Sequence, residues 1–199
     1  MTTDTTEKAF QNDIIAHLVS TCYHQRGNHN YNKASCIDPE LTLKFIQDTQ
    51  PKDWIKFKRV YGENAERKFF YRLFSEIDKK GTINVLRSGF KDVGCHFELF
   101  YPKPNNRKNP DLFAKFEKNT FSVIDELEYE QKEDSKRLDL VISVNGLPII
   151  TIELKDTFSQ GVESAIKQYK EDRDPREKIS QRCFVHFAMS DEKIFMATK

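Results

Sequence analysis

Three ionisable side chains interrupt the most apolar stretch of this sequence, and their types and spacing could serve phosphate chemistry. Asp139 lies at one end of the stretch, and Glu153 and Lys155 lie at the other. Two carboxylates beside a lysine are costly on a largely buried pair of strands unless something compensates their charge. Mg²⁺ or Mn²⁺ would do so, and the lysine could orient a water or stabilise charge on a phosphate. The competing interpretation is an ordinary ion pair on a solvent-facing strand.

The elements that must position these side chains are two antiparallel strands, expected over residues 138–144 and 148–155. β-branched residues flank Asn145-Gly146, a pair that is typical of hairpin turns. Because side chains alternate along a strand, the apolar residues of each strand are expected to share one face. They are Leu138, Leu140, Ile142 and Val144 in the first strand, and Ile150, Ile152 and Leu154 in the second.

The connection between these strands decides which way the charges point, because a slip of one residue inverts every side chain. If the apolar faces lie on the same side, the connection must hold an odd number of residues. The sequence therefore predicts a three-residue loop with Gly146 in the left-handed conformation. Asp139 would then face Thr151, with Glu153 one diagonal step away, and Lys155 would share their surface.

The rest of the chain predicts a mainly helical section over 1–81 and a β-rich section over 82–199. Apolar periodicity and capping residues predict helices over 7–20, 38–48, 63–79, 110–118 and 161–172, and a short helix from Pro51. Strands are expected over 83–86, 95–101, 120–130, 183–188 and 194–197. Residues 21–37 and 102–109 are expected to be loops, and 131–136 a charged link. The three cations of the loop over 102–109 could touch a phosphate backbone or simply be solvated.

Three polar residues outside the hairpin are candidates for the same site or for the core. Glu7, in the first turn of the first helix, either favours the helix dipole or adds a metal ligand. Gln168 adjoins the inner face of the helix after Lys155, where it could bond a nucleotide or a metal-bound water; otherwise it is a surface residue. His186 is expected to face the core.

Composition limits the class of protein. The 199 residues carry a net charge of +1, and no apolar run is long enough to cross a membrane. The first residues lack the pattern of a signal peptide, so a soluble, cytoplasmic protein with reduced cysteines is expected. Cys22, His24, His29 and Cys36 could gather a zinc ion, but their spacing fits no familiar zinc finger.

The hairpin and its surroundings resemble the N-terminal nuclease domain of type I restriction enzyme R (restriction and translocation) subunits. The resemblance rests on residues 138–155, 162–169 and 172–177. It extends to the helix of Glu7 and to 38–40, 45–51, 85–89, 185–188 and 196–198. It implies an α/β (α+β) fold of the PD-(D/E)xK nuclease type, a mixed sheet flanked by helices. It also implies Mg²⁺-dependent endonuclease cleavage of double-stranded DNA.

The roles implied by the resemblance fall on five residues. Asp139 and Glu153 would bind metal, and Lys155 would position the water or stabilise the transition state. Glu7 corresponds to an acidic residue of the first helix, and Gln168 to the glutamine of the helix after the motif. Two departures concern other positions: leucine replaces the proline that names the motif at 138, and aspartate stands at 172 where some relatives have tyrosine. The role of Tyr169, which adjoins the glutamine, stays open.

In this family an ATP-driven motor follows the nuclease domain in the same chain, and specificity and methylation subunits complete the assembly. The sequence lacks a GxxxxGK[ST] loop, so ATP binding would belong to a motor outside it. The chain is expected to be a single nuclease domain over 1–199, excised from a longer polypeptide. The alternatives are a stand-alone nuclease of the same fold and a non-catalytic DNA-binding or assembly module.

Overall fold

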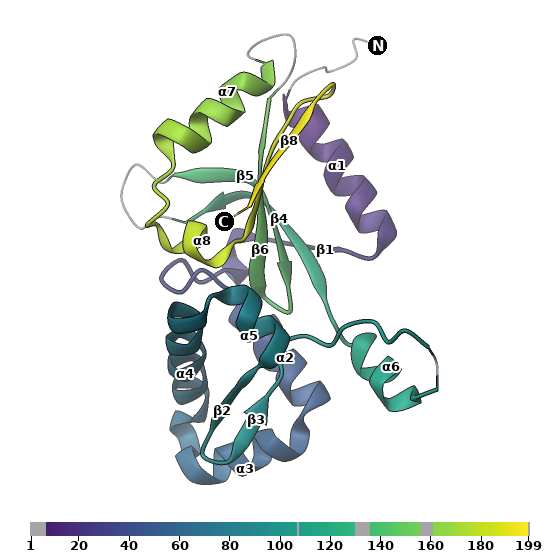
Figure 1. Ribbon diagram of the computed structural model, residues 1–199, viewed down its shortest axis with the longest axis vertical. Coiled ribbons are helices and arrows are strands. Elements are labelled where there is room, and N and C mark those ends of the chain that lie inside the picture. Colours follow the sequence, from purple (N-terminus) through teal and green to yellow (C-terminus); the bar gives the residue numbers. More distant parts are fainter. Residues whose placement is uncertain (1–6, 107, 130–135, 156–160, 199) are drawn as a thin grey trace. The chain divides into compact units, whose positions relative to one another are not determined.

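The computed structural model describes residues 7–106, 108–129, 136–155 and 161–198 (Figure 1). They form two compact units, each made of segments that are distant in sequence. Unit 1 comprises residues 1–37, 121–143 and 147–199, and unit 2 comprises residues 38–120 and 144–146. Residues 131–135 of the link predicted over 131–136 lie outside the described residues, as does Arg107 of the predicted loop. Whether both units act as a single nuclease domain stays a prediction.

Unit 1 is built on a six-stranded mixed sheet with the strand order β1-β4-β5-β6-β7-β8. β1 runs parallel to β4, β6 runs parallel to β7, and β7 is antiparallel to β8. The strands are β1 His24–Arg26, β4 Phe121–Glu128, β5 Arg137–Val144, β6 Leu147–Leu154, β7 Val185–Met189 and β8 Ile194–Thr198. This arrangement confirms the predicted mixed α/β class.

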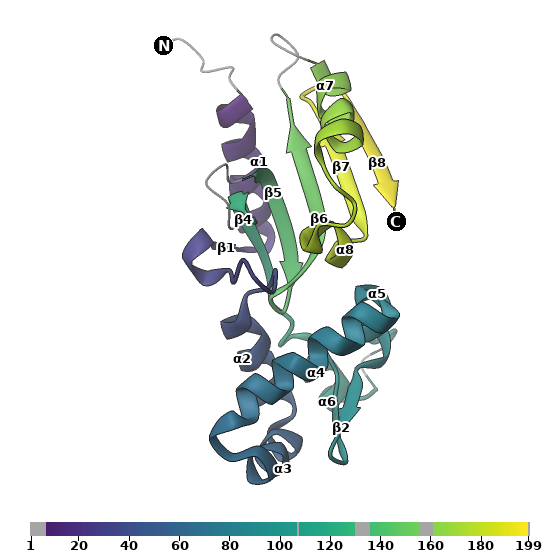
Figure 2. The ribbon, with the colours of Figure 1, turned by 90° about the vertical axis from the view of Figure 1, so that its left-hand side faces the viewer.

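Helices cover both faces of this sheet (Figure 2). Helix α1, Glu7–Thr21, packs Ile15 against Val123, Leu140, Ile152 and Leu154. On the other face lie α7, Gly161–Lys167, which packs on Ala188, and α8, Lys178–Arg182, whose Ile179 joins Leu138 and Val141. The apolar residues of the sheet are therefore buried on both sides.

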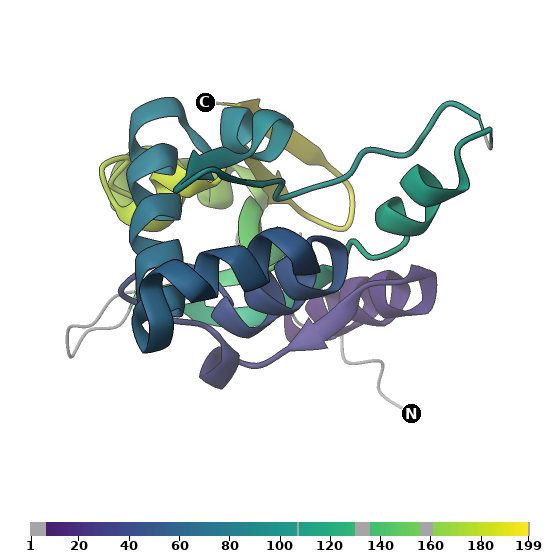
Figure 3. The same ribbon diagram turned by 90° about the horizontal axis from the view of Figure 1, so that it is seen from below.

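Unit 2 combines helices with a small antiparallel sheet (Figure 3). Its helices are α2 Pro39–Thr49, α3 Pro51–Tyr61, α4 Ala65–Lys80, α5 Thr82–Ser88 and α6 Pro110–Phe116, with a short η2 at Gly62–Asn64. Strands β2, Phe90–Asp92, and β3, Cys95–Phe97, pair with each other. Aromatic rings form much of its core, where Trp54, Phe57 and Phe69 contact Phe97.

The predicted strand over 83–86 is wrong, because these residues belong to α5. Its buried residues, Thr82, Val85 and Leu86, follow the helical spacing of three and four. The strand expected over 95–101 stops at Phe97. The next backbone amide, of Glu98, donates to the Gln50 side chain, and the Glu98 carbonyl accepts from it. A glutamine side chain thus takes the place of a neighbouring strand.

Two further differences affect unit 1. The predicted loop over 21–37 contains β1 and the 3-10 turn η1, Asn28–Asn30. The short β1 sequence, His-Gln-Arg, has no apolar signal and forms a strand by pairing with β4. The helix predicted over 161–172 changes after Lys167 into a π-helical turn, Gln168–Asp172, labelled η3. Helix α8 was not predicted.

The hairpin connection is a correction to the predicted three-residue loop. β5 ends at Val144 and β6 begins at Leu147, so the turn holds two residues. Asn145 and Gly146 both have positive φ, 50° and 81°, as a type I′ turn requires. Gly146 is left-handed, as predicted. The turn is fixed in unit 2, where the Gly146 carbonyl accepts from the Asp38 amide at 2.8 Å.

The predicted apolar face is confirmed for Leu140 and Ile142 in β5 and for Ile150, Ile152 and Leu154 in β6, but it is wrong for Leu138. Leu138 belongs to the cluster under α8, whereas Leu140 and Ile142 belong to the cluster under α1. Ile149 and Ile150, although adjacent, both pack on the α1 cluster. Because neither strand keeps a strict two-residue period, turn parity alone does not decide which charged groups meet.

Candidate active site

Asp139 and Glu153 come together across β5 and β6. The Leu154 amide, which follows Glu153, donates to Asp139 Oδ2 at 2.6 Å. This bond places the Asp139 carboxylate beside Glu153. The sequence instead predicts that Asp139 faces Thr151 and lies one diagonal step from Glu153. Asp139 is half-buried and Glu153 is fully buried. The structure therefore contains the expected carboxylate pair, through a different register.

The two oxygens of Glu153 have unequal surroundings. Arg173 donates to Oε1 from Nε at 2.8 Å and also from Nη2. Oε2 is buried and has no hydrogen-bond partner among the described residues. An unpaired buried carboxylate oxygen is energetically costly, so it marks a position where a proton or a cation would be stabilising.

The protonation of Glu153 reflects this environment. Burial raises its pKa to about 8; the positive charge of Arg173 opposes the shift, and the negative charge of Asp139 adds to it. A carboxyl group perturbed by burial and by a second carboxylate is typical of functional sites. Near neutral pH, this raised pKa favours the protonated form of Glu153.

Lys155 and Glu7, two other predicted site residues, contact each other. Lys155 Nζ donates to Glu7 Oε2 at 3.1 Å. Within the described residues, Lys155 makes no hydrogen bond to Asp139 or Glu153. Gln11, one turn after Glu7, donates to the main-chain carbonyl of Asp139 at 2.6 Å. The start of α1 is thus attached to the strand that carries Asp139.

Gln168 begins the π-helical turn η3 and is half-buried. Its carbonyl accepts from the Arg173 amide at 3.1 Å, which closes the wide turn. Its side chain makes no bond to Asp139, Glu153 or Lys155 in the part of the chain that the structure describes. π-helical turns often occur at functional sites. Here the turn brings Arg173 to Glu153.

The available donors fall short of a complete protein-only metal site but suit a partly hydrated cation. Among the described residues, no group of three or more His, Cys, Asp and Glu side chains is arranged to hold a metal ion. Two carboxylates nevertheless fit Mg²⁺, which usually takes one or two of them and completes its shell with water and phosphate. Asp139 and Glu153 supply that number, and Glu153 Oε2 needs a partner. The zinc alternative gains no such support: Cys22 is exposed, whereas Cys36 is buried beside Tyr31.

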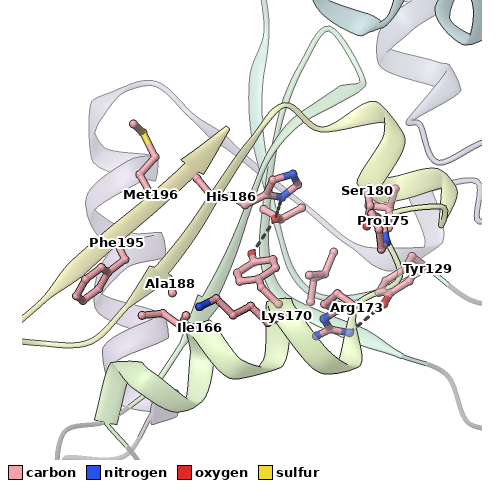
Figure 4. A pocket seen from close by; sticks show the side chains of 15 residues that line it. Tyr129, Ile166, Lys170, Arg173, Pro175, Ser180, His186, Ala188, Phe195 and Met196 are labelled. Atoms are coloured by element: carbon pink, nitrogen blue, oxygen red, sulfur yellow. Dashed lines mark hydrogen bonds between the residues drawn. The ribbon is translucent and has the colours of Figure 1, made fainter. Parts of the chain in front are cut away.

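A pocket of about 560 Å³ lies on the α7 side of the sheet, with Arg173 in its wall (Figure 4). His186, which is expected to face the core, is half-buried and also lines this pocket. His186 Nδ1 and the Tyr169 hydroxyl both bond Thr151 Oγ1, at 2.7 and 2.8 Å. The pocket lies beside the carboxylate pair and does not include Asp139 or Glu153.

Sequence reasoning missed Arg173 and Gln11. Arg173 stands in a segment dense in charged residues, where spacing does not distinguish one cation from another. Tyr129, the aromatic neighbour of Arg173, is distant from it in sequence. Gln11 lies on a helix in which the apolar residues give the stronger sequence signal. A buried polar residue on an otherwise amphipathic helix is visible only after the fold is known.

The sequence matches a known protein family over its C-terminal half. The family described as Type I restriction enzyme R protein N terminus matches residues 94–199, more than half of the chain. The matched span includes Asp139, Glu153, Lys155, Gln168 and Arg173, whereas Glu7 precedes it. No curated protein matches the sequence. None of the described helices is long and apolar enough to span a membrane.

Proposed function

The chain belongs to the family of type I restriction enzyme R proteins, whose N-terminal region it matches, and from this premise we propose that it is an endonuclease. Its substrate would be the phosphodiester backbone of double-stranded DNA, and its cofactor Mg²⁺, which Mn²⁺ could replace. The reaction would be that of a type I site-specific deoxyribonuclease with a PD-(D/E)xK site.

The observation that carries this proposal is the Asp139–Glu153 pair. The two carboxylates lie side by side on neighbouring strands, and the buried Glu153 Oε2 has no partner among the described residues. An ordinary surface ion pair would be solvated and would pair both oxygens with cations or water. A buried unpaired oxygen beside a second carboxylate is better explained as half of a cation site.

The residues at and around the Asp139–Glu153 pair would each have a separate role in hydrolysis. A bound Mg²⁺ would activate a water and neutralise charge on the phosphate. Asp139 and Glu153 would hold it. Lys155, now paired with Glu7, carries a positive charge that could stabilise the negative charge developing on the phosphate. Gln168 is proposed to contact the nucleotide or a water of the metal, and Glu7 to keep Lys155 oriented.

The proposed setting follows the family. The chain would work with an ATP-driven translocase in the full-length protein and with specificity and methylation subunits, in the cytoplasm. A stand-alone nuclease would cut without these partners. A non-catalytic module would bind DNA without cutting it.

The test is plasmid cleavage by the reconstituted assembly, with ATP hydrolysis measured in parallel. Asp139→Asn and Lys155→Ala are expected to lower cleavage by at least about 100-fold, because each removes charge stabilisation of the transition state, while ATP hydrolysis is retained. Glu163→Gln is the control, since Glu163 lies on α7 and pairs with Lys193 at the surface. Normal cutting by Asp139→Asn would reject the assignment.

A further inference from the structure

Arg173 is the most extensively anchored cation of the candidate site. Besides its two bonds to Glu153, it donates from Nη1 to the Tyr129 hydroxyl at 2.9 Å and from Nη2 to the Arg137 carbonyl at 2.5 Å. Its guanidinium also lies over the Tyr129 ring, 5.7 Å from the centroid. Figure 4 shows Arg173 and Tyr129 joined in the wall of the pocket. Contacts outside Glu153 therefore fix the guanidinium independently of the carboxylate.

The way in which Arg173 binds Glu153 is unusual for a structural ion pair. Arginine and carboxylate commonly pair as two forks, with one nitrogen on each oxygen. Here both guanidinium nitrogens bond Oε1, and Oε2 is left without a partner among the described residues. The Arg173 side chain is 9% exposed and that of Glu153 is 0% exposed, so this is an interior ion pair and not a solvated surface pair.

We propose that Arg173 is a positioning residue that holds Glu153 by Oε1 and so presents Oε2, next to Asp139, to a divalent cation. The inference rests on the proposed function and adds a residue to it. Arg173 would touch neither the cation nor the DNA; it would act through the orientation of a ligand. Groups that orient metal ligands in this way are often worth a factor of about 10–100 in metal affinity.

The local structure explains why arginine is needed at this position. The π-helical turn ends at Asp172, and Arg173 then takes an extended conformation with φ −95° and ψ 120°. From there one planar side chain reaches Glu153 in β6, Tyr129 directly after β4 and the Arg137 carbonyl at the start of β5. Lysine has a single ammonium group and cannot reproduce the fixed fork that makes these bonds at once.

The experiment measures Mn²⁺ binding to the chain by calorimetry at constant pH, without DNA. Arg173→Gln should raise the dissociation constant about 10–100-fold, because Glu153 loses the group that orients it. Arg173→Lys should recover part of the loss, and Tyr129→Phe should give a smaller effect by removing one anchor. Arg176→Gln is the matched control: Arg176 is 87% exposed and pairs with Asp174 at the surface.

Two results separate the inference from the function on which it rests. If Glu153→Gln abolishes Mn²⁺ binding while folded Arg173→Gln binds with the wild-type constant, the positioning role is rejected and the metal site stands. If Glu153→Gln leaves binding unchanged, the metal site itself is rejected. Should Arg173→Gln fail to fold, Tyr129→Phe decides, and an unchanged dissociation constant in that variant would overturn the inference.

Discussion

At the scale of residues, the candidate site depends on how Glu153 is held. The side chain is fully buried, one oxygen is bonded by arginine, and a second carboxylate lies nearby. Arg173 compensates the charge at Oε1 only, so a negative charge at Oε2 is costly without a proton or a second cation. The stability of the metal-free chain should therefore depend on pH.

Removing this buried acid should change that dependence. The pKa of Glu153 rises from 4.5 unfolded to about 8 folded, mainly through burial. The folded state then binds more protons, so its stabilisation is complete below pH 4.5 and is lost as pH rises to about 8. The slope is at most about 1.4 kcal/mol per pH unit. Chemical denaturation in EDTA between about pH 5 and pH 8 should show this decline, and Glu153→Gln should flatten it. A decline unchanged by Glu153→Gln would contradict the account.

The identities of Asp139, Glu153 and Lys155 as candidates could be predicted, because charges in an apolar hairpin are visible in the sequence. Their partners could not. Arg173 and Gln11 reach the strands only through tertiary contacts, and the pairing of Lys155 with Glu7 depends on the placement of α1. The assignment of these residues to catalysis stays a prediction.

At the scale of elements, the hairpin turn is the point where a single substitution has the clearest consequence. A Cβ at Gly146 would lie 2.2 Å from the Asp38 carbonyl oxygen and 2.6 Å from Thr42 Oγ1. Gly146→Ala should lower the free energy of unfolding by about 2–4 kcal/mol, from the positive φ and from the clash. Gly62→Ala, at φ 57° with open space around it, adds backbone strain without a clash and should cost less than Gly146→Ala. Both free energies of unfolding can be measured with a chemical denaturant. Equal losses in Gly146→Ala and Gly62→Ala would contradict a clash at Gly146.

The Asn145 side chain gives a second test of the same turn. It is fully buried, donates to the Leu99 carbonyl at 2.9 Å and accepts from the Thr120 amide at 2.8 Å. Asn145→Ala leaves both backbone groups without these partners and should destabilise the protein by about 2–4 kcal/mol. Asn106→Ala is a suitable control, because Asn106 is exposed and its side chain accepts from the nearby Lys108 amide. Equal free energies of unfolding for Asn145→Ala and Asn106→Ala would contradict the stabilising role of the Asn145 side chain.

The sequence predicted the hairpin and the left-handed Gly146, since both are local. It failed on loop length, because the parity rule assumes strands with an unbroken period of two. It failed on α5 for a similar reason: Ile83, Val85 and Leu86 are β-branched or apolar, and only burial distinguishes a strand from a helix over so few residues.

At the scale of the whole molecule, the R-protein family and the mixed α/β class agree with the sequence, whereas the two units could not be predicted. Residues 144–146, at the turn between β5 and β6, belong to unit 2, although the rest of both strands belongs to unit 1. No change of composition marks this exchange, because it arises from contacts between distant segments.

Charge is also distributed unevenly. On α3, Lys52, Lys56 and Arg59 are exposed on one stripe at helical spacing, and Lys52 and Arg59 form no ion pair within the described residues. If the chain binds DNA as proposed, reversing these three charges to Glu should weaken binding about tenfold or more. The slope of log binding constant against log salt concentration should also become less steep, by about 0.9 for each phosphate that the variant no longer neutralises. Lys44→Glu is the control, since Lys44 is already paired with Asp48. Fluorescence anisotropy at several salt concentrations measures both, and unchanged salt dependence would exclude α3 from the DNA interface.

The most direct test of the central claim is a crystal structure of the chain soaked in Mn²⁺, with anomalous scattering recorded. We expect a manganese peak bonded to the Asp139 carboxylate and to Glu153 Oε2, with Arg173 still on Oε1. The peak should be absent from Glu153→Gln crystals. Well-occupied manganese elsewhere, with no density between these two carboxylates, would contradict the account.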